Sequence, residues 1–381
     1  MDFSLSDEQR TLRDATLDFA KKELQDDLIA RDRDGVFPED LWKKCATFGI
    51  QGMPFPQAYG GGDSDILTTV LAMEALGYGC KDNGLLFALN AQMWSVQMPI
   101  HMFGTDEQKK KYLTPMCKGD LIGAHGMSEP GSGSDAFSLT TTARKEGNSY
   151  ILNGAKTFVS NAPVADMFVV FANTNRSKGF MGISAFLIDR NTEGLQVGKN
   201  IGKMGLRTSP WSEVVMEDCR IDEGQRLGKE GNGAGIFEDS MAWERSFILA
   251  NYVGGMERQI ETCITYAKTR RQFGQPISKF QAVANRIVDM KVRLETARNL
   301  LYKVAWMMDK GSPSVLDAAI LKLYLSENWI KSCMDATQIH GGYGFTTEYE
   351  VERDLRDAVG STLYSGTSEM QRNLIARHLR L

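Results

Sequence analysis

The sequence predicts an α+β protein in which a helical region is followed by a β region and then by a second helical region. Apolar residues recur at helical spacing over residues 6–118 and again from residue 231 to the end of the chain. Over residues 121–228 the pattern changes to short alternating or β-branched runs separated by Gly, Asn and Pro. With 381 residues, 42% of them hydrophobic, the chain is long enough for two or three domains with sizeable cores.

The first predicted domain covers residues 1–118 and is helical. It contains SDEQRTLRDATLDFAKKEL, which opens with a Ser/Asp cap, and TDEQKKKYLTPMCKG, which repeats the cap at Thr105. Its main interruption is PFPQAYGGGDS, whose Pro and Gly residues predict a loop between helices.

The second and third predicted domains cover residues 119–229 and 230–381. The second contains the strand patterns NSYILNG, KTFVSNA, MFVVFAN, ISAFLID and SEVVMEDCRI, which together predict a β domain of ordinary size. The third contains the long helical patterns GIFEDSMAWERSFILANYVGGMERQIETCITYAKTR and FQAVANRIVDMKVRLETARNLLYKVAWMMDKG. Patterns of this length suit a bundle of long antiparallel helices.

Charge and motif content exclude several classes of function. The net charge of -4 and the pI near 5.8 give no reason to expect nucleic acid or an anionic membrane as a partner. No run of eighteen apolar residues is present, and the start is a charged helical pattern rather than a signal peptide. The six cysteines are far apart and form no CxxC, so we expect no metal and a reduced, cytoplasmic, soluble protein. The chain also has no G-x-G-x-x-G after a strand and no P-loop, which argues against a nicotinamide dehydrogenase or an NTPase.

Three dense stretches have both a structural and a functional interpretation. GMSEPGSGSD (126–135) is either a tight connector or a cradle for an anion or a polar ring, since small residues permit close backbone approach. QIHGGYGFTTEYEVERDLRDA (338–358) reads by itself as a helix end followed by a turn. TRRQFG (269–274) places two arginines beside an aromatic residue, which either complements the helix dipole or clamps a phosphate-bearing cofactor.

Glu244 is the most informative single residue. It lies in MAWERSFIL, and its helical neighbours three and four residues away are Ser240, Met241, Phe247 and Ile248, none of which is a cation. A carboxylate on an apolar helix face is costly unless it is paired or its pKa is raised, and a raised pKa suits a general base. A pair with an arginine from another helix is an equally good interpretation of the sequence by itself.

The chain resembles the acyl-CoA dehydrogenase family over nearly its whole length. The resemblance rests on separated stretches in a fixed order: GMSEPGSGSD, ILNGAKTFVSNA, KMGLRTSPWSEVVMEDCRI, GKEGNGAG, TRRQFGQPISKFQ, QIHGGYGFTTEYEVERDLRDA and YSGTSEMQR. It implies an N-terminal helical domain, a middle β-barrel domain and a C-terminal four-helix bundle. It also implies an oxidoreductase that binds FAD between domains and at a subunit interface of a homotetramer.

The resemblance assigns cofactor contacts residue by residue. The residues that match contacts to the flavin are Met127, Ser128, Gly133 and Ser134. Phe158 stands where the family commonly has a tryptophan beside the flavin ring, and Ser160 stands where the family has a flavin-contacting threonine. Both are conservative differences from the family pattern at positions that control access to the flavin ring. The remaining matches concern the dinucleotide: Arg270, Phe273 and Gln281 from a neighbouring subunit, Gln338 and Gly342 at another part of that site, and Thr367 and Glu369 at the pyrophosphate or adenosine end.

The resemblance also indicates the base. Many members carry a glutamate directly before the Gly-Thr-Ser turn, where this chain has Ser365. A smaller set, resembling isovaleryl-CoA dehydrogenase, has a glutamate directly before an arginine on the first long helix of the C-terminal domain, and Glu244 with Arg245 matches that arrangement. The resemblance thus implies that Glu244 is the base and that the backbone N–H of Ser365 polarises the thioester carbonyl. It also implies that Arg245 supports the base or the substrate, and an interhelical salt bridge is an equally good interpretation of Arg245.

Within the family, AWERSFILANYVGG and SGTSEMQRN are most similar to bacterial dehydrogenases that oxidise a prolyl group held on a carrier protein in secondary metabolism. The resemblance implies an acyl or aminoacyl carrier protein as partner, with either an electron-transfer flavoprotein or oxygen as electron acceptor. Two other hypotheses stay open: the same chemistry on a short or branched acyl-CoA, and a non-catalytic flavin-binding paralogue. Glu244 argues against the paralogue, because an inactive site needs no acid on an apolar helix face.

Overall fold

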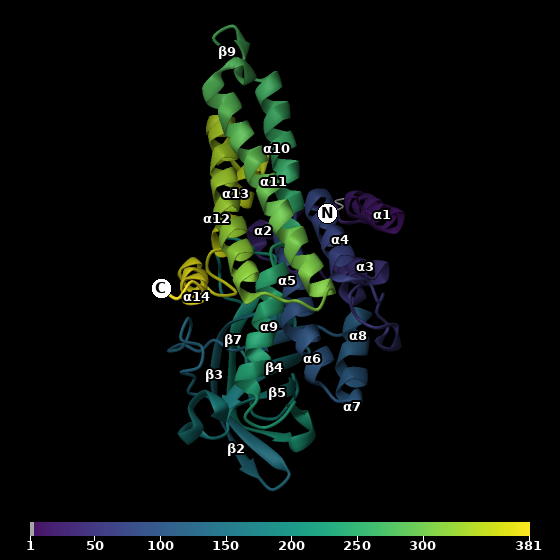
Figure 1. Cartoon of the computed structure of the whole chain (residues 1–381), viewed down its shortest axis with the longest axis vertical. Helices are drawn as coiled ribbons and strands as arrows, with labels where there is room; N and C mark the ends of the chain where they lie inside the picture. The colour runs from purple at the N-terminus through teal and green to yellow at the C-terminus, as the bar shows by residue number, and fades with distance from the viewer. Residues whose placement is uncertain (1–3) are drawn as a thin grey trace.

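The structure is a computed structural model that describes residues 4–381, and it has a helical N-terminal part, a middle β domain and a C-terminal helical part (Figure 1). The N-terminal helices are α1 (Asp7–Glu23), α2 (Leu28–Asp34), α3 (Glu39–Phe48), α4 (Ile66–Gly79), α5 (Asn83–Gln92), α6 (Met98–Phe103), α7 (Asp106–Gln108) and α8 (Thr114–Cys117). The predicted α+β class is therefore confirmed. The division at residues 118/119 and 229/230 stays a prediction.

Two predicted caps start helices in this region. The Ser6 hydroxyl accepts a hydrogen bond from the Gln9 backbone N–H at 3.1 Å, and the Gln9 side chain accepts from the Ser6 backbone N–H at the same distance. Thr105 and Gln108 form the same reciprocal pair at the start of α7. Each pair satisfies two backbone donors that a helix start would otherwise leave unpaired, which explains why the helices begin there.

The middle part is an eight-stranded sheet. Its strands are β1 (Gly123–Gly126), β2 (Thr142–Glu146), β3 (Ser149–Ser160), β4 (Met167–Asn173), β5 (Ile183–Asp189), β6 (Leu195–Val197), β7 (Trp211–Asp222) and β8 (Arg226–Leu227). The order is β6-β7-β3-β2-β4-β5-β8, and β1 pairs with β4 in parallel. β4 and β5 are buried along most of their length, and the sheet encloses a core of its own that includes Tyr150, Phe168 and Phe186.

The C-terminal part contains the long helices. They are α9 (Gly233–Phe247), α10 (Ala250–Thr269), α11 (Gln281–Asp309), α12 (Val315–His340), α13 (Val351–Gly360) and α14 (Ser368–His378). A short hairpin, β9 (Arg271–Gln272) with β10 (Gln275–Pro276), joins α10 to α11 at the tip of the bundle (Figure 1). At the other end, α9 and α14 lie where the bundle meets the β domain (Figure 1).

The N-terminal and C-terminal parts share one hydrophobic core, and their helices α4 and α10 cross at two glycines. A Cβ atom on Gly77 would stand 1.7 Å from the Asn251 carbonyl oxygen, and one on Gly254 would stand 1.9 Å from the Glu74 carbonyl oxygen. Such separations are far below van der Waals contact, so only glycine allows the two backbones to approach this closely.

No helix in residues 4–381 is long and apolar enough to cross a membrane. All six cysteines are buried and free: Cys45, Cys80, Cys117, Cys219, Cys263 and Cys333.

Candidate active site

A deep cleft of about 1190 Å³ lies where the three parts of the chain meet. Its wall is formed by α5, by β1 and the loop after it, by the loop before β7, by α9, and by the segment that joins α13 to α14. The predicted site residues that line it are Met127, Ser128, Gly133, Ser134, Phe158, Ser160, Glu244, Arg245, Ser365 and Thr367. The structure thus brings together one side of the predicted cofactor site and the predicted base.

The loop after β1, residues 127–135, is held by a buried ion pair. Lys156 of β3 contacts Glu129 at 2.8 Å, with both side chains at most 2% exposed, and it also donates to the Met127 carbonyl at 3.2 Å. Glu129 accepts two further backbone hydrogen bonds, from Thr140 at 2.6 Å and Thr141 at 3.0 Å. Although burial opposes ionisation, these donors and Lys156 together lower the pKa of Glu129 to about 2. The charged pair therefore fixes the loop, and GMSEPGSGSD is a connector that also lines the cleft.

Phe158 forms part of the cleft with an unpredicted partner. It has a φ of 55° and is 57% exposed, and its ring centre lies 4.9 Å from that of Trp211 at the start of β7. Both rings line the cleft. A non-glycine residue at positive φ is strained, and such strain is typical of residues held for a functional purpose. The exposed Phe158 ring and the half-buried Trp211 ring together offer a flat apolar wall against which a ring can stack.

Glu244 lies near the end of α9 and points into the cleft. The Ser365 hydroxyl donates a hydrogen bond to its Oε1 at 2.5 Å. Burial raises the pKa of Glu244, while the Ser365 hydrogen bond and the charges of Arg245 and Lys322 oppose that rise. No arginine of another helix forms an ion pair with Glu244 in the part of the chain that the structure describes, so the alternative interpretation from the sequence does not hold.

The segment that carries Ser365 is fixed from behind. Ser365 has a φ of 57° and Gly366 a φ of 85°, so the chain makes two left-handed steps before α14 begins. The Gln371 amide donates to the carbonyls of Ser365 and Gly366 at 3.2 and 2.9 Å, and Lys322 of α12 donates to the Gly366 carbonyl at 2.7 Å. Sequence reasoning missed Lys322 and Gln371. One sequence feature could have indicated Lys322: it falls at helical spacing from Ala318 and Leu325, on the face of α12 that is buried.

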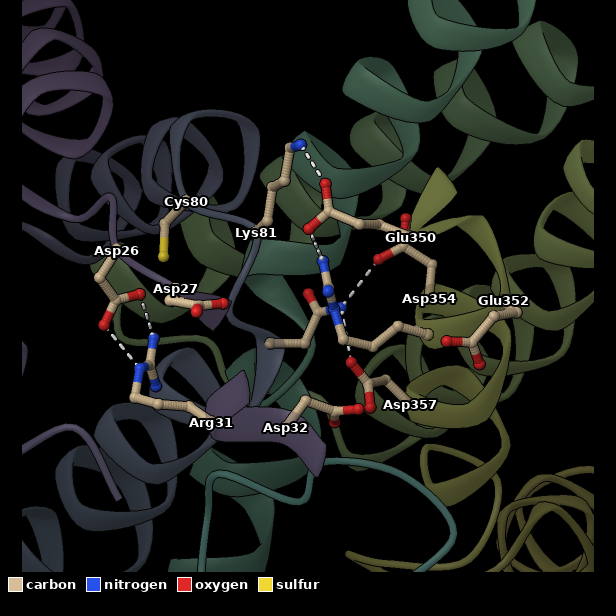
Figure 2. Close-up of polar contacts among 12 residues, drawn as sticks. Asp26, Asp27, Arg31, Asp32, Cys80, Lys81, Glu350, Glu352, Asp354 and Asp357 are labelled. Carbon is tan, nitrogen blue, oxygen red and sulfur yellow. Dashed lines mark hydrogen bonds and ion pairs between the residues drawn. The ribbon is translucent and has the colours of Figure 1, made fainter. Parts of the chain in front are cut away.

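The loop before β7 is held at the cleft by a polar junction with the start of α5 and with α13. Figure 2 shows Asp357 of this junction among neighbouring charged side chains of α2 and α13, including Asp32 and Asp354. The Leu206 backbone N–H donates to Asp357 at 2.5 Å, and Asn83 donates to Asp357 at 3.1 Å. The Thr208 hydroxyl donates to Asp82 at 2.5 Å. Complete burial raises the pKa of Asp357 to about 7. The junction sets the position of Leu206, which lines the cleft with Asp357.

The other predicted cofactor residues do not line the cleft. Arg270 and Phe273 lie at the tip of the bundle, beside the β9–β10 hairpin (Figure 1), and Phe273 is 93% exposed. The Arg270 guanidinium lies 5.5 Å from the ring centre of Tyr343, which brings it near the Gly-Gly-x-Gly segment. The residues at this end of the bundle are Arg270, Phe273, Gln281, Gln338 and Gly342; Glu369 lies in the first turn of α14 outside the cleft lining.

The cleft suits FAD on its own geometry. Its volume exceeds the range usual for a drug-sized ligand and leaves room for a dinucleotide together with a substrate. Gly131 and Gly133 have open space where a side chain would project, so a ligand can approach the backbone there. Thr367 caps α14, whose N-terminus faces the cleft and favours negative charge such as a phosphate.

Comparison with known proteins agrees with this geometry. Family models described as the N-terminal, middle and C-terminal domains of acyl-CoA dehydrogenase match residues 6–120, 124–219 and 231–380. The chain therefore belongs to the acyl-CoA dehydrogenase family, and it is a flavoprotein oxidoreductase that uses FAD.

Three similar proteins are informative. A protein of a Serratia species named L-prolyl-[peptidyl-carrier protein] dehydrogenase is 43% identical over 381 residues, which covers 100% of this chain and 99% of that protein. The crystal structure of the prolyl acyl carrier protein oxidase AnaB has a TM-score of 0.98 and 50% identity, covering 99% of this chain and all of that one. A structure of PigA with FAD and proline has a TM-score of 0.97 and 42% identity over the full length of both chains.

Proposed function

We propose that this enzyme oxidises an L-prolyl group, held as a thioester on a carrier protein, to a dehydroprolyl or pyrroline thioester. Dehydrogenation of acyl thioesters is the activity of the family, and two of the similar proteins named above, the Serratia dehydrogenase and AnaB, are named for prolyl groups of carrier proteins. The observation that carries the proposal is the Glu244 carboxylate, placed in the cleft and hydrogen-bonded by Ser365 at 2.5 Å.

Glu244 acts as the base that removes the α-proton of the thioester. A thioester α-proton is weakly acidic, so its removal needs a base whose pKa lies above that of an ordinary carboxylate. Burial in the cleft raises the pKa of Glu244 in this direction. Bound FAD supplies the acceptor for the hydride that leaves Cβ. The Ser365 hydroxyl keeps the Glu244 carboxylate in one orientation, so that its second oxygen is available to the α-proton.

The backbone of the Ser365 turn stabilises the thioester carbonyl oxygen. The carbonyls of Ser365 and Gly366 are taken by Gln371 and Lys322. Within residues 4–381 the backbone N–H groups of Ser365 and Gly366 donate no hydrogen bond, and both residues line the cleft. Preorganised N–H groups of this kind stabilise the negative charge that develops on oxygen when the α-proton leaves.

The neighbourhood of the base suits a small ring. Phe87 of α5 and Tyr364 pack with ring centres 4.7 Å apart, and both line the cleft with Met241 of α9. These side chains give the acyl group an apolar surface. The same surface suits a short or branched acyl group, so a CoA thioester of that kind is the second candidate substrate.

Neighbouring subunits complete the cofactor site in this proposal. Arg270 and Phe273 are exposed at the end of the bundle, away from the cleft of their own chain. An exposed arginine beside an exposed aromatic ring can bind a phosphate and stack on a purine. A homotetramer brings these residues to the cleft of another subunit.

Anaerobic flavin bleaching tests the substrate. The purified protein is mixed with prolyl-loaded carrier protein and, separately, with isovaleryl-CoA, and the absorbance of oxidised flavin is followed. Bleaching by the prolyl carrier protein alone is the expected result. Bleaching by the CoA ester alone would replace the proposal by ordinary acyl-CoA oxidation, and bleaching by neither would contradict both substrates.

A further inference from the structure

Lys322 is a fully buried lysine that lies behind the Ser365 turn. Its ammonium donates to the Gly366 carbonyl at 2.7 Å and lies 5.9 Å from the ring centre of Tyr364. Within residues 4–381 it has no acidic partner at ion-pair distance. Burying an ammonium without an ion pair is costly, and an apolar side chain of the same length would avoid that cost.

The charges that face Lys322 come from three helices. They are Glu244 and Arg245 of α9, Glu327 of α12 itself and Glu369 of α14. Burial lowers the pKa of Lys322 to about 7, and the Glu244 carboxylate is the strongest influence in the opposite direction. The same interaction acts in reverse, because the Lys322 charge opposes the rise in the pKa of Glu244. The lysine and the base are therefore electrostatically coupled although they do not touch.

Lys322 also shares a geometric task with Gln371. Both donate to the Gly366 carbonyl, and Gln371 donates to the Ser365 carbonyl as well. These bonds hold two successive residues at positive φ, one of which is not a glycine. In that conformation the Ser365 hydroxyl reaches Glu244 at 2.5 Å. Removing either donor frees the turn to relax and weakens this contact.

We propose that Lys322 is a positioning residue for the dehydrogenation: it fixes the Gly366 carbonyl, which holds Ser365 against Glu244, and its charge keeps the base in its ionised form. Lys322 does not line the cleft and touches neither substrate nor reacting atoms. The inference rests on the proposed role of Glu244 as the base. It does not depend on which thioester is the substrate.

The test compares Lys322→Met with Lys322→Arg. Anaerobic flavin reduction is measured across pH with whichever thioester reduces the wild type, and FAD content and melting temperature are recorded for each variant. We expect Lys322→Met to reduce the rate about ten- to a hundredfold, as for loss of a hydrogen bond from a charged group. This exceeds the effect of losing the Ser365 hydroxyl alone, because a relaxed turn also displaces the backbone N–H groups of Ser365 and Gly366. The acid limb of the pH–rate profile of Lys322→Met, where the rate falls because Glu244 becomes protonated, should move to higher pH. Loss of a nearby positive charge raises the pKa of Glu244. Lys322→Arg should keep the acid limb in place and recover part of the rate.

Gln371→Leu separates geometry from charge and serves as a second test if Lys322→Met does not fold. It removes two hydrogen bonds to the turn without changing any charge. The rate should therefore fall, and the acid limb of the pH–rate profile should move to higher pH by less than in Lys322→Met, because only the contact from Ser365 to Glu244 is weakened. A wild-type rate in Gln371→Leu, or a wild-type acid limb in folded, FAD-loaded Lys322→Met, would overturn the inference. If no thioester reduces the wild type, the proposed function itself fails, and the inference with it.

Discussion

The two ends of the C-terminal bundle differ in how completely one chain determines them. At the cleft end, Glu244 and Ser365 are held by contacts from α9, α12 and α14 of the same chain. At the tip, Phe273 is 93% exposed and Phe345 is 85% exposed, and their rings project into solvent. The resemblance to the family assigns site residues to both ends, with Glu244 and Ser365 at the cleft and Arg270 and Phe273 at the tip. A single chain therefore holds the predicted base in place, whereas at the tip the predicted cofactor residue Phe273 is left exposed to solvent.

Substitution of the proposed base, at the cleft end of the bundle, should give the largest effect. Glu244→Gln keeps the size of the side chain but cannot accept the α-proton. We expect flavin reduction to slow by about a hundred- to ten-thousandfold, the usual contribution of a general base. Anaerobic stopped-flow absorbance measures it. Asp239→Asn, an exposed acid on the same helix, is the matched control and should keep the wild-type rate. A Glu244→Gln enzyme that turns over normally would remove Glu244 from the mechanism.

Substitution at the tip examines the other end. Arg270→Ala should weaken FAD binding about ten- to a hundredfold if the guanidinium binds a phosphate of the cofactor in a neighbouring subunit. Fluorescence titration of the apoprotein with FAD measures it, with sedimentation velocity to follow assembly. Lys310→Ala, an exposed cation at the other end of α11, should bind FAD like the wild type. Equal affinities in the two variants would mean that the tip has no part in the cofactor site.

Loss of the Ser365 hydroxyl should have a smaller and pH-dependent effect. The hydrogen bond from Ser365 lowers the pKa of Glu244, so Ser365→Ala should raise that pKa further. Because the base must be ionised, the acid limb of kcat/KM moves to higher pH and activity is lost severalfold below it. Activity should return as the pH rises. A uniform loss at every pH would instead indicate that Ser365 acts through geometry alone.

The smallest effect on turnover is expected at the polar junction beneath the cleft. The pKa of Asp357 is about 7 in the folded protein against an ordinary value of 3.8, so the folded state favours its protonated form. The corresponding stability is complete below pH 3.8 and is lost as the pH rises to about 7. Asp357→Asn should flatten this decline of the free energy of unfolding by roughly 4 kcal/mol, since the pKa shift is about three units and one pKa unit corresponds to about 1.4 kcal/mol. Denaturant unfolding at several pH values measures it, and an unchanged decline would contradict the assignment.

The sequence was sufficient for features that local patterns encode. The caps at Ser6 and Thr105 and the change from helical to alternating periodicity all appear in the structure. Glu244 could be selected because a carboxylate among apolar neighbours is visible in one helix alone. The helix end at Thr269 was also predicted, whereas the short hairpin after it was not, because its strands of two residues carry no periodicity.

Features that depend on tertiary packing were not accessible. Trp211 meets Phe158 only through the pairing of β7 with β3, and nothing in either segment indicates the contact. Lys322 and Gln371 converge on one carbonyl from different helices. Neither residue was predicted, because the carbonyl that they share follows only from the way α12 packs against α14.

The glycine crossing of α4 and α10 limits how this enzyme can acquire a new substrate. Because Gly77 and Gly254 leave no room for even one methyl group, the spacing between the N-terminal and C-terminal parts is fixed at this crossing. The cleft-lining helices α5 and α9 directly adjoin α4 and α10 in the chain, so the width of the cleft near the proposed base should resist small adjustments between the two parts. Adaptation to a larger acyl group has to come from trimming single side chains that face the cleft, such as Phe87 or Met241. Specificity in this chain should accordingly change in discrete steps, one side chain at a time.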